Sequence, residues 1–381
     1  MIKILSISTD RKIFDQNSAV RTRMIEYGAL FEETHMVIFT LKGQGFKMTQ
    51  INKNVFIYPT SSKNKLRYIF DAVRIARAII IERGFGLENC ILTSQDPFET
   101  GLVAIALKKL TNIKVQIQAH TDFLSSNFRN NFLNTIRYFI AVYTIKNANT
   151  IRVVSDRIKE SIVNKMNISE KNIEVLPIFL DISKIKYHKL KNNIRIKYPK
   201  FNFFILVICR LEKEKNITDI IDMMSNITRE FPKTALIIIG DGREKENLLK
   251  KVYSLGIKDN VFFEGWSDDV LSYLKTGDVL VVNSAYEGYG MTIVEAVASG
   301  CPVITTDVGI SREYIKDRIN GYICPVGENP CIESKLKALI KDFRIYDEMK
   351  KNSRLEADNL ISDKDQYLEH YRKILESTLT K

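Results

Sequence analysis

The chain has 381 residues, which is more than one ordinary domain needs and enough for two. Hydrophobic residues make up 45% and charged residues 27% of the chain, the balance of a water-soluble globular protein. The formal net charge of +12 favours an anionic partner, such as nucleotide phosphates or an anionic membrane surface, although a lysine-rich solvated surface accounts for much of the excess. The sequence has no RNA- or DNA-binding motif, so no nucleic-acid partner is expected.

The cysteines and the first residues indicate the cellular compartment. The five cysteines form no Cys-x-x-Cys pair and their number is odd, which argues against a disulfide framework or a zinc site and fits a reducing cytosol. The opening MIKILSIS leads into a polar turn and predicts a first strand rather than a signal peptide. No apolar run approaches the ~20 residues of a membrane span. We therefore expect a cytoplasmic protein, with peripheral attachment to the inner face of the membrane left open.

Short β-branched runs alternate with amphipathic stretches along the whole chain. Several runs are apolar throughout, which is typical of strands buried on both faces in parallel, doubly wound sheets. The predicted strands are 2–8, 35–41, 54–58, 90–94, 115–119, 150–154, 173–177, 203–209, 235–239, 260–263, 278–282, 302–306 and 321–325.

This pattern restarts near Phe201, after the lysine- and asparagine-rich stretch Lys184–Lys200. The sequence therefore predicts an α/β protein with two Rossmann-like domains that face each other. Their predicted extents are 1–183 and 184–365, with 366–381 as a C-terminal helix that returns to the first domain. Because ligands of such sheets bind beyond the carboxyl ends of the strands, functional residues are expected in the loops that follow strands.

In the first half, two predicted helices combine basic and aromatic residues. They are Lys65–Arg83 and Phe128–Lys146, and either would suit an anionic membrane surface. The favoured interpretation is that each helix covers its own sheet. Of the four histidines, only His120 ends a predicted strand in a loop that faces the expected cleft. A structural histidine held by hydrogen bonds is the alternative to a functional one.

The loop after the strand 203–209 is strongly charged. Arg210 comes directly after the strand, where a phosphate would lie, and its planar guanidinium suits bidentate phosphate binding. Lys215 falls at the start of the next predicted helix, Ile217–Phe231, where a cation opposes the helix dipole unless an anion lies beside it. The alternative, a solvated charged loop, is strongest for Lys213.

Two further loops of the second half contain glycine at a strand end. The run IIIGDG includes Gly240 and Gly242, which fall short of the dinucleotide-binding fingerprint and by themselves indicate a tight turn. The run FFEGW ends a strand at Gly265 and places the only tryptophan, Trp266, directly after it. Trp266 is expected either to pack against the domain or to lie against a nucleobase.

A short predicted helix, Met291–Ser299, carries one charge, Glu295. Gly300 and Pro302 end the helix. Apolar side chains cover most of its circumference, so the carboxylate is costly to bury unless it has a partner. A neighbouring loop amide is one possible partner, and a bound ligand is another.

The helix begins at a glycine-rich loop, EGYG, that contains Glu287. The free amides of Gly290, Met291 and Thr292 form an anion site there, aided by the helix dipole. Glu295 lies about one turn further along, where its carboxylate would accept hydrogen bonds from paired hydroxyls such as those of ribose. Glu287 would serve a second polyol, and the alternative is an exposed turn residue.

Taken together, these features resemble the C-terminal half of glycosyltransferase family 4, retaining enzymes of the GT-B fold. Order and spacing agree over roughly residues 203–325. The matching features are Arg210 with Lys215, GDG, FFEG, Glu287-x7-Glu295, and EAVASGCPVITTDVG. The first half resembles the family more loosely, through a first strand, a helix with Arg21 and Arg23, and VQIQAHTD ending near His120.

The resemblance implies roles for individual residues. Arg210 and Lys215 would hold the diphosphate of a nucleotide sugar, which is the donor substrate. Glu295 would bind the ribose hydroxyls, while Glu287 and His120 would contact the donor sugar. The remaining nucleotide-binding positions are Gly240, Trp266 and the amides of Gly290, Met291 and Thr292.

The family retains the anomeric configuration, and the leaving phosphate helps to deprotonate the acceptor. The departing diphosphate has to be stabilised, which an arginine, a lysine and a helix N-terminus can do. No catalytic metal and no tightly bound cofactor are therefore expected. Two positions depart from the family pattern, because Asn17-Ser18 and Gly309-Ile310 stand where many members have a double glycine.

The sequence therefore predicts a retaining glycosyltransferase. It would move a hexose-type sugar from a UDP- or GDP-linked donor to a hydroxyl of a glycan or lipid-linked acceptor. A nucleotide-sugar 2-epimerase of the same fold is an alternative. A non-catalytic subunit of a glycosylation complex is another, although such a subunit has no use for all four of Arg210, Lys215, Glu287 and Glu295.

Overall fold

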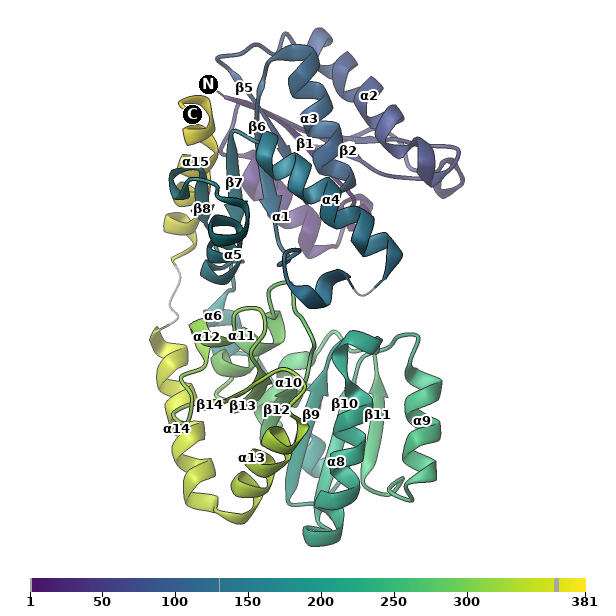
Figure 1. The fold of residues 1–381 in the computed structure, drawn as a ribbon, viewed down its shortest axis with the longest axis vertical. Helices are drawn as coiled ribbons and strands as arrows, with labels where there is room; N and C mark the ends of the chain where they lie inside the picture. Colours follow the sequence, from purple (N-terminus) through teal and green to yellow (C-terminus); the bar gives the residue numbers. More distant parts are fainter. Residues whose placement is uncertain (1, 130, 360–362) are drawn as a thin grey trace. The chain divides into compact units, whose positions relative to one another are not determined.

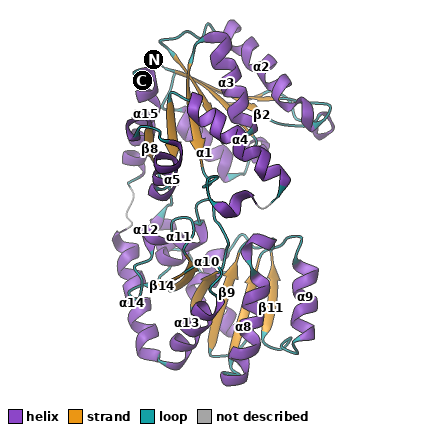
Figure 2. Ribbon diagram, viewed as in Figure 1, coloured by secondary structure: helices purple, strands orange, loops and turns teal. Residues whose placement is uncertain are grey.

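The computed structural model describes residues 2–129, 131–359 and 363–381. The chain divides into two compact units (Figure 1). The first unit combines Met1–Phe179 with Asp363–Lys381, and the second is Leu180–Ser362. Each unit is an open sheet with helices on both faces (Figure 2).

The sheet of the first unit has the strand order β3-β4-β2-β1-β5-β6-β7-β8. All neighbours are parallel except β3 and β4. The short edge strand β3 is absent from the sequence prediction, because the polar run Thr49–Asn52 lacks an apolar pattern. The strands are β1 Lys3–Ser8, β2 Glu33–Ile38, β3 Thr49–Asn52, β4 Val55–Pro59, β5 Cys90–Ser94, β6 Lys114–Ala119, β7 Thr150–Val153 and β8 Ile173–Val175.

Helices of the first unit pack on this sheet, with α3 in contact with both α2 and α4. The last helix, α15, packs Tyr371, Ile374 and Leu375 against a cluster that includes Ile4 and Leu176. The C-terminal segment thus completes the core of the first unit. The helices are α1 Ala19–Gly28, α2 Tyr68–Glu82, α3 Glu99–Thr111, α4 Phe132–Asn147, α5 Asp156–Met166 and α15 Lys364–Glu376.

The sheet of the second unit is parallel throughout, in the order β11-β10-β9-β12-β13-β14. All residues of β9, β10, β12 and β13 are buried, which explains why these runs are almost wholly apolar, with threonine as the polar residue in β10 and β13. The strands are β9 Phe203–Ile208, β10 Thr234–Ile239, β11 Val261–Gly265, β12 Val279–Val282, β13 Val303–Thr306 and β14 Gly321–Cys324.

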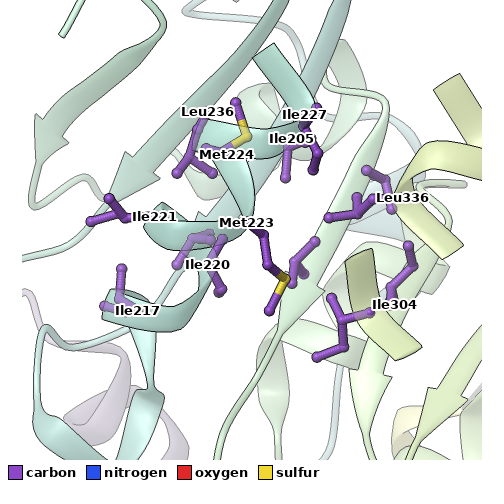
Figure 3. Packing of buried hydrophobic residues seen from close by; sticks show 14 of the residues in the cluster. Ile205, Ile217, Ile220, Ile221, Met223, Met224, Ile227, Leu236, Ile304 and Leu336 are labelled. Atoms are coloured by element: carbon purple, nitrogen blue, oxygen red, sulfur yellow. The ribbon is translucent and has the colours of Figure 1, made fainter. Parts of the chain in front are cut away.

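Helix α8 carries a large part of the core of the second unit (Figure 3). Its residues Ile217, Ile220 and Met224 pack against strand residues such as Ile205 and Leu236. Burying a side chain of this size contributes about 1.5–3 kcal/mol. The helices are α6 Ile182–Lys186, α7 Ile194–Lys197, α8 Ile217–Glu230, α9 Lys245–Ser254, α10 Val270–Thr276, α11 Met291–Ala298, α12 Ser311–Tyr314, α13 Asn329–Lys341 and α14 Phe343–Asn359.

One pair of cysteines is joined, although the number and spacing of the cysteines argue against a disulfide framework. Cys324 ends β14 and Cys331 lies in the first turn of α13, so the short connection brings their Cα atoms to 6.0 Å and a disulfide links them. Spacing in the sequence does not show this, because the approach depends on the turn between strand and helix.

Within the described residues, no helix combines the length and the apolar character that crossing a membrane requires.

Candidate functional site

The loops that follow β9 and β12 are joined to each other at the carboxyl edge of the second sheet. The Ala285 amide donates a hydrogen bond to the Glu214 carbonyl at 2.8 Å. The Asn216 side chain donates to the Asn283 carbonyl at 3.0 Å. Asn216 has a left-handed backbone, with φ of +48°, at the point where the loop turns into α8. The loop after β9 and the loop after β12 are therefore held together by hydrogen bonds.

Lys215 and Glu287, from these two loops, lie in direct contact. Lys215 Nζ is 2.6 Å from Glu287 Oε1, and Ser284 Oγ donates to the same oxygen at 2.6 Å. The side chains of Lys215 and Glu287 are only 11% and 15% exposed, so water screens the pair poorly. Glu287 is thus the anion that Lys215 needs at the start of α8. The alternative of an exposed turn residue at Glu287 is wrong.

The glycines of the loop after β10 permit close backbone packing. A Cβ atom at Gly240, where φ is +138°, would lie 1.9 Å from the Cys209 carbonyl oxygen. A Cβ atom at Gly242 would lie 2.4 Å from the Leu211 oxygen. This loop therefore packs directly on the segment that carries Arg210. The Arg210 side chain is exposed and, within the part of the chain that the structure describes, its guanidinium makes no ion pair.

The start of α11 is supported by the loop after β13. Gly290 caps the helix with φ of +98°, and the Ile310 amide donates to the Tyr289 carbonyl at 3.0 Å. A Cβ atom at Gly309 would lie 2.3 Å from that same carbonyl oxygen. Met291 and Thr292 are the first helical residues, so their amides have no carbonyl within the helix to bind. These amides are available to an anion.

Glu295 lies on α11 and is half-buried. Burial raises the pKa of its carboxyl group from 4.5 to about 7. Among the residues that the structure describes, no group donates a hydrogen bond to this carboxylate and no cation pairs with it. The neighbouring loop amide of the alternative interpretation does not serve as its partner. Glu295 therefore remains a buried acid whose charged form needs a ligand.

Trp266 follows the last residue of β11 and its side chain is 73% exposed. Packing against its own unit therefore does not explain this tryptophan. The Gly240 amide donates to the Gly265 carbonyl at 2.7 Å, which ties the two loops together. Trp266 thus presents an open aromatic surface at the carboxyl edge of the sheet.

His120 follows β6 at the carboxyl edge of the first sheet, and its Nε2 lies 3.1 Å from Gln118 Oε1. Burial, together with the positive charges of Arg152 and Arg23, lowers the pKa of His120 to about 3. The imidazole is therefore neutral near pH 7.

At Asn17-Ser18, the hydroxyl of Ser18 caps α1 by accepting a hydrogen bond from the Arg21 amide at 3.1 Å, so a side chain occupies the place of a second glycine.

His120 also lines a cavity of about 410 Å³ that lies wholly within the first unit. Arg152, on β7, shares this cavity and is not among the site residues predicted from the sequence. The signal was present, because Arg152 interrupts an otherwise apolar predicted strand. Among the described residues, no three His, Cys, Asp or Glu side chains are grouped so that they could hold a metal ion.

Comparison with known proteins adds to this geometry. Residues 32–184 match the family model described as Glycosyltransferase Family 4, and residues 191–356 match that of Glycosyl transferases group 1. The N-acetyl-alpha-D-glucosaminyl L-malate synthase of Bacillus anthracis is 24% identical over 334 residues, 85% of each chain. A UDP-Gal:alpha-D-GlcNAc-diphosphoundecaprenol alpha-1,3-galactosyltransferase of Escherichia coli is 22% identical over 265 residues, 67% of each chain.

Solved structures share the fold. Sucrose-phosphate synthase from Thermosynechococcus elongatus superimposes with a TM-score of 0.79 at 15% identity over the full length of both chains. Anabaena HepE in complex with UDP gives a TM-score of 0.74 at 17% identity, over 99% of this chain and 100% of HepE. Two parallel α/β units with these neighbours define a GT-B fold, which confirms the predicted fold class. The chain belongs to glycosyltransferase family 4 and is a glycosyltransferase.

Proposed function

We propose that this glycosyltransferase moves a hexose-type sugar from a nucleoside diphosphate sugar to a hydroxyl group of a glycan or lipid-linked acceptor, with retention of configuration. The observation that carries the proposal is the contact between Lys215 and Glu287 beside the first turn of α11. A cation, a carboxylate and free helix amides then lie together. The cation and the amides suit phosphate, whereas the carboxylate suits sugar hydroxyls.

Several groups of the second unit would hold the donor. Arg210 is exposed and makes no ion pair with any described residue, so its guanidinium is available to the diphosphate together with Lys215 and the amides at the start of α11. Glu295 would accept hydrogen bonds from the two ribose hydroxyls, which would satisfy its buried carboxylate. Glu287, held by Ser284 and Lys215, would contact the donor sugar.

The nucleobase would lie beside Gly240 and Trp266. Trp266 is exposed next to the loop of Gly240, and an exposed aromatic ring gains from stacking on a base. HepE is similar in fold and its structure contains UDP, which makes uridine the first base to test. Guanosine is the second.

The proposed reaction breaks the bond between the anomeric carbon and the diphosphate oxygen. The acceptor oxygen bonds to the same face of that carbon, and the departing phosphate oxygen takes the acceptor proton. Arg210 and Lys215 would stabilise the charge that develops on the diphosphate. His120 would contact the donor sugar as a neutral hydrogen-bond partner, since burial and the charges of Arg152 and Arg23 lower its pKa to about 3.

A thermal-unfolding screen tests the donor. UDP, GDP and ADP and their common sugars are added to the full chain, and the preferred ligand raises the unfolding temperature by mass action. Incubation with that donor alone should then release free nucleotide slowly by hydrolysis. An epimerised sugar would contradict the transferase and favour the 2-epimerase. Failure of every nucleotide to bind would favour a non-catalytic subunit.

We also propose that the first unit contacts an anionic membrane surface through α4. Phe132, Ile136, Phe139 and Tyr143 are 40–83% exposed and recur on one side of the helix, opposite the buried Ala141. No residue of α4 is acidic, and Lys146 is basic, whereas Arg137 is paired with Glu99 at 2.9 Å. A helix that is apolar on both sides calls for a second covering surface. The expectation that such a helix covers only its own sheet leaves this side unexplained.

Flotation with liposomes containing anionic lipid tests the membrane contact. The wild-type chain should float at low salt, and Phe139→Ser should float less with unchanged thermal stability. Tyr187→Ser is the matched control, because Tyr187 is 77% exposed on the second unit. Equal flotation of wild type and Phe139→Ser would remove the proposal.

A further inference from the structure

Arg152 is a deeply buried cation with incomplete compensation. It is the third residue of β7, every residue of that strand is buried, and the arginine is 5% exposed. Its Nη1 donates to Gln118 Oε1 at 3.2 Å, and its Nη2 lies 3.4 Å from the Leu176 carbonyl oxygen and 3.5 Å from the Tyr367 hydroxyl. Its Nε has no hydrogen-bond partner among the described residues.

No described carboxylate lies within ion-pair distance of Arg152. The ring of Tyr371 offers a weaker interaction, with the guanidinium carbon 5.5 Å from the ring centroid. Burying an arginine without a counter-charge is costly. Elsewhere in the chain, Lys215 is buried to a similar degree and has Glu287 at 2.6 Å. Arg152 therefore lacks the partner that such a cation ordinarily has.

The missing partner has room to bind. Arg152 lines the cavity of about 410 Å³ in the first unit, together with Arg23, His120, Gln118 and Tyr27. Both arginines act on the His120 ring, which places positive charge at this end of the cavity. The volume is in the range of small-ligand sites.

Two carboxylates also line this cavity. Asp10 follows β1 and Asp96 follows β5, and both line the cavity. Each carboxylate accepts a hydrogen bond from a nearby amide, at 3.1 Å from Lys12 and 2.8 Å from Phe98. Because β6 lies between β5 and β7, the strand that Asp96 follows and the strand that carries Arg152 are about 10 Å apart. A ligand that spans this distance would offer hydroxyls at one end and negative charge at the other.

We propose that the acceptor of the glycosyl transfer carries an anionic group, a carboxylate or a phosphate, which binds Arg152 and Arg23 in the cavity of the first unit. This inference rests on the proposed function, since it names the class of acceptor. The guanidinium groups of Arg152 and the exposed Arg23 attract the anion, while Asp10 and Asp96 accept hydrogen bonds from hydroxyls of the same molecule. The anionic group fixes the acceptor, and a hydroxyl is the group that receives the sugar.

Binding of three small probes to the full chain tests the proposal. The probes are sn-glycerol 3-phosphate, L-malate and uncharged glycerol, each titrated at constant ionic strength and followed by calorimetry. We expect at least one anionic probe to bind, glycerol to bind at least tenfold more weakly, and Arg152→Met to lose at least tenfold in affinity for the anion. Arg152→Lys should recover part of the loss. The two anionic probes distinguish a phosphate from a carboxylate acceptor.

A second variant covers the case in which Arg152→Met does not fold. Arg23 is exposed on α1, so Arg23→Met should keep the fold and weaken anion binding several-fold. Arg21→Met, on the same helix, is the control and should leave anion binding unchanged. Equal binding of the anions and glycerol by the wild type would overturn the proposal. Unchanged anion affinity in Arg152→Met would also overturn the proposal. If Arg152→Met does not fold, unchanged anion affinity in Arg23→Met would overturn it instead. UDP binding, measured in the same samples, depends on the second unit and tests the proposed function separately.

Discussion

The carboxyl edges of the two sheets differ in whether their buried cation has a counter-charge. In the second unit, Lys215 and Glu287 are in contact at 2.6 Å and need no ligand to stay in place. In the first unit, Arg152 is 5% exposed and has no described carboxylate beside it. A paired site is organised before its ligand arrives, whereas an unpaired charge is stabilised by the ligand itself. Glu295 and the exposed Arg210 differ from this pair, since among the described residues neither makes an ion pair.

Substitution of Lys215 or Glu287 should have the largest effect on activity. Lys215→Ala and Glu287→Ala should each lower the transfer rate by about 100-fold or more, because each removes a group that acts on the donor and leaves the other charge half-buried and alone. Steady-state kinetics with the donor found by thermal screening measures this effect.

Lys213→Ala is the matched control, since Lys213 is an exposed lysine of the same loop. The double variant Lys215→Ala/Glu287→Ala should lose less than the product of the two single losses, because the residues act as a unit. Full activity in either single variant, with the fold intact, would contradict the proposed roles.

The backbone scaffold of the second site gives the next largest effect. Gly240→Ala should destabilise the chain by about 3 kcal/mol, since the new Cβ meets the Cys209 oxygen in a backbone conformation that disfavours side chains. Gly256→Ala should cost only about 1 kcal/mol, because φ there is +68° but nothing lies within 4 Å. Urea unfolding compares the two, and equal losses would mean that close packing at Gly240 contributes nothing.

Because Glu295 is partly buried without a partner among the described residues, it should make the stability of the chain depend on pH. The folded chain keeps a proton on Glu295 up to about pH 7, whereas the unfolded chain loses it near pH 4.5. The stability contribution of this group therefore falls as pH rises from about 4.5 to 7 and stays low above that window. Glu295→Gln should remove this fall, and saturating UDP should reduce it in the wild type. Unfolding measured in urea from pH 5 to 8 tests this, and identical pH profiles for wild type and Glu295→Gln would refute it.

Trp266 gives the smallest expected effect. Trp266→Ala should weaken UDP binding roughly two- to tenfold, the range for loss of an aromatic contact, with little change in stability because the ring is 73% exposed. Tyr253→Ala, at a 66% exposed aromatic of α9, should leave UDP affinity unchanged. Isothermal calorimetry distinguishes the two. An unchanged affinity in Trp266→Ala would place the base elsewhere.

The two edges also differ in how far the sequence predicts them. In the second unit, Glu287, Gly290 and Glu295 lie within one short segment, so spacing shows their relation. The contact of Glu287 with Lys215 is less visible, since it depends on two loops after different strands. The first-unit cavity is built from β1, β5, β6, β7 and the distant helix α15, and no local pattern links them. Arg152 was therefore not singled out.

The fold was more predictable than either site. Buried parallel strands are mostly apolar, and the thirteen predicted strand runs each coincide with a strand in the structure. Edge strand β3 was not predicted, because Thr49–Asn52 is polar and half-exposed and is defined by its pairing with β4. The disulfide was also not predicted, since it depends on the turn between β14 and α13.

Helix α15 has a consequence for synthesis. Tyr371, Ile374 and Leu375 belong to the same core as Ile4 and Leu176, yet residues 180–362 of the second unit separate them in the chain. As a ribosome makes the protein from its N-terminus, the second unit is complete while the first still lacks this helix. The unit that begins first thus finishes last, and until then the nascent chain exposes an apolar surface at which a chaperone could act.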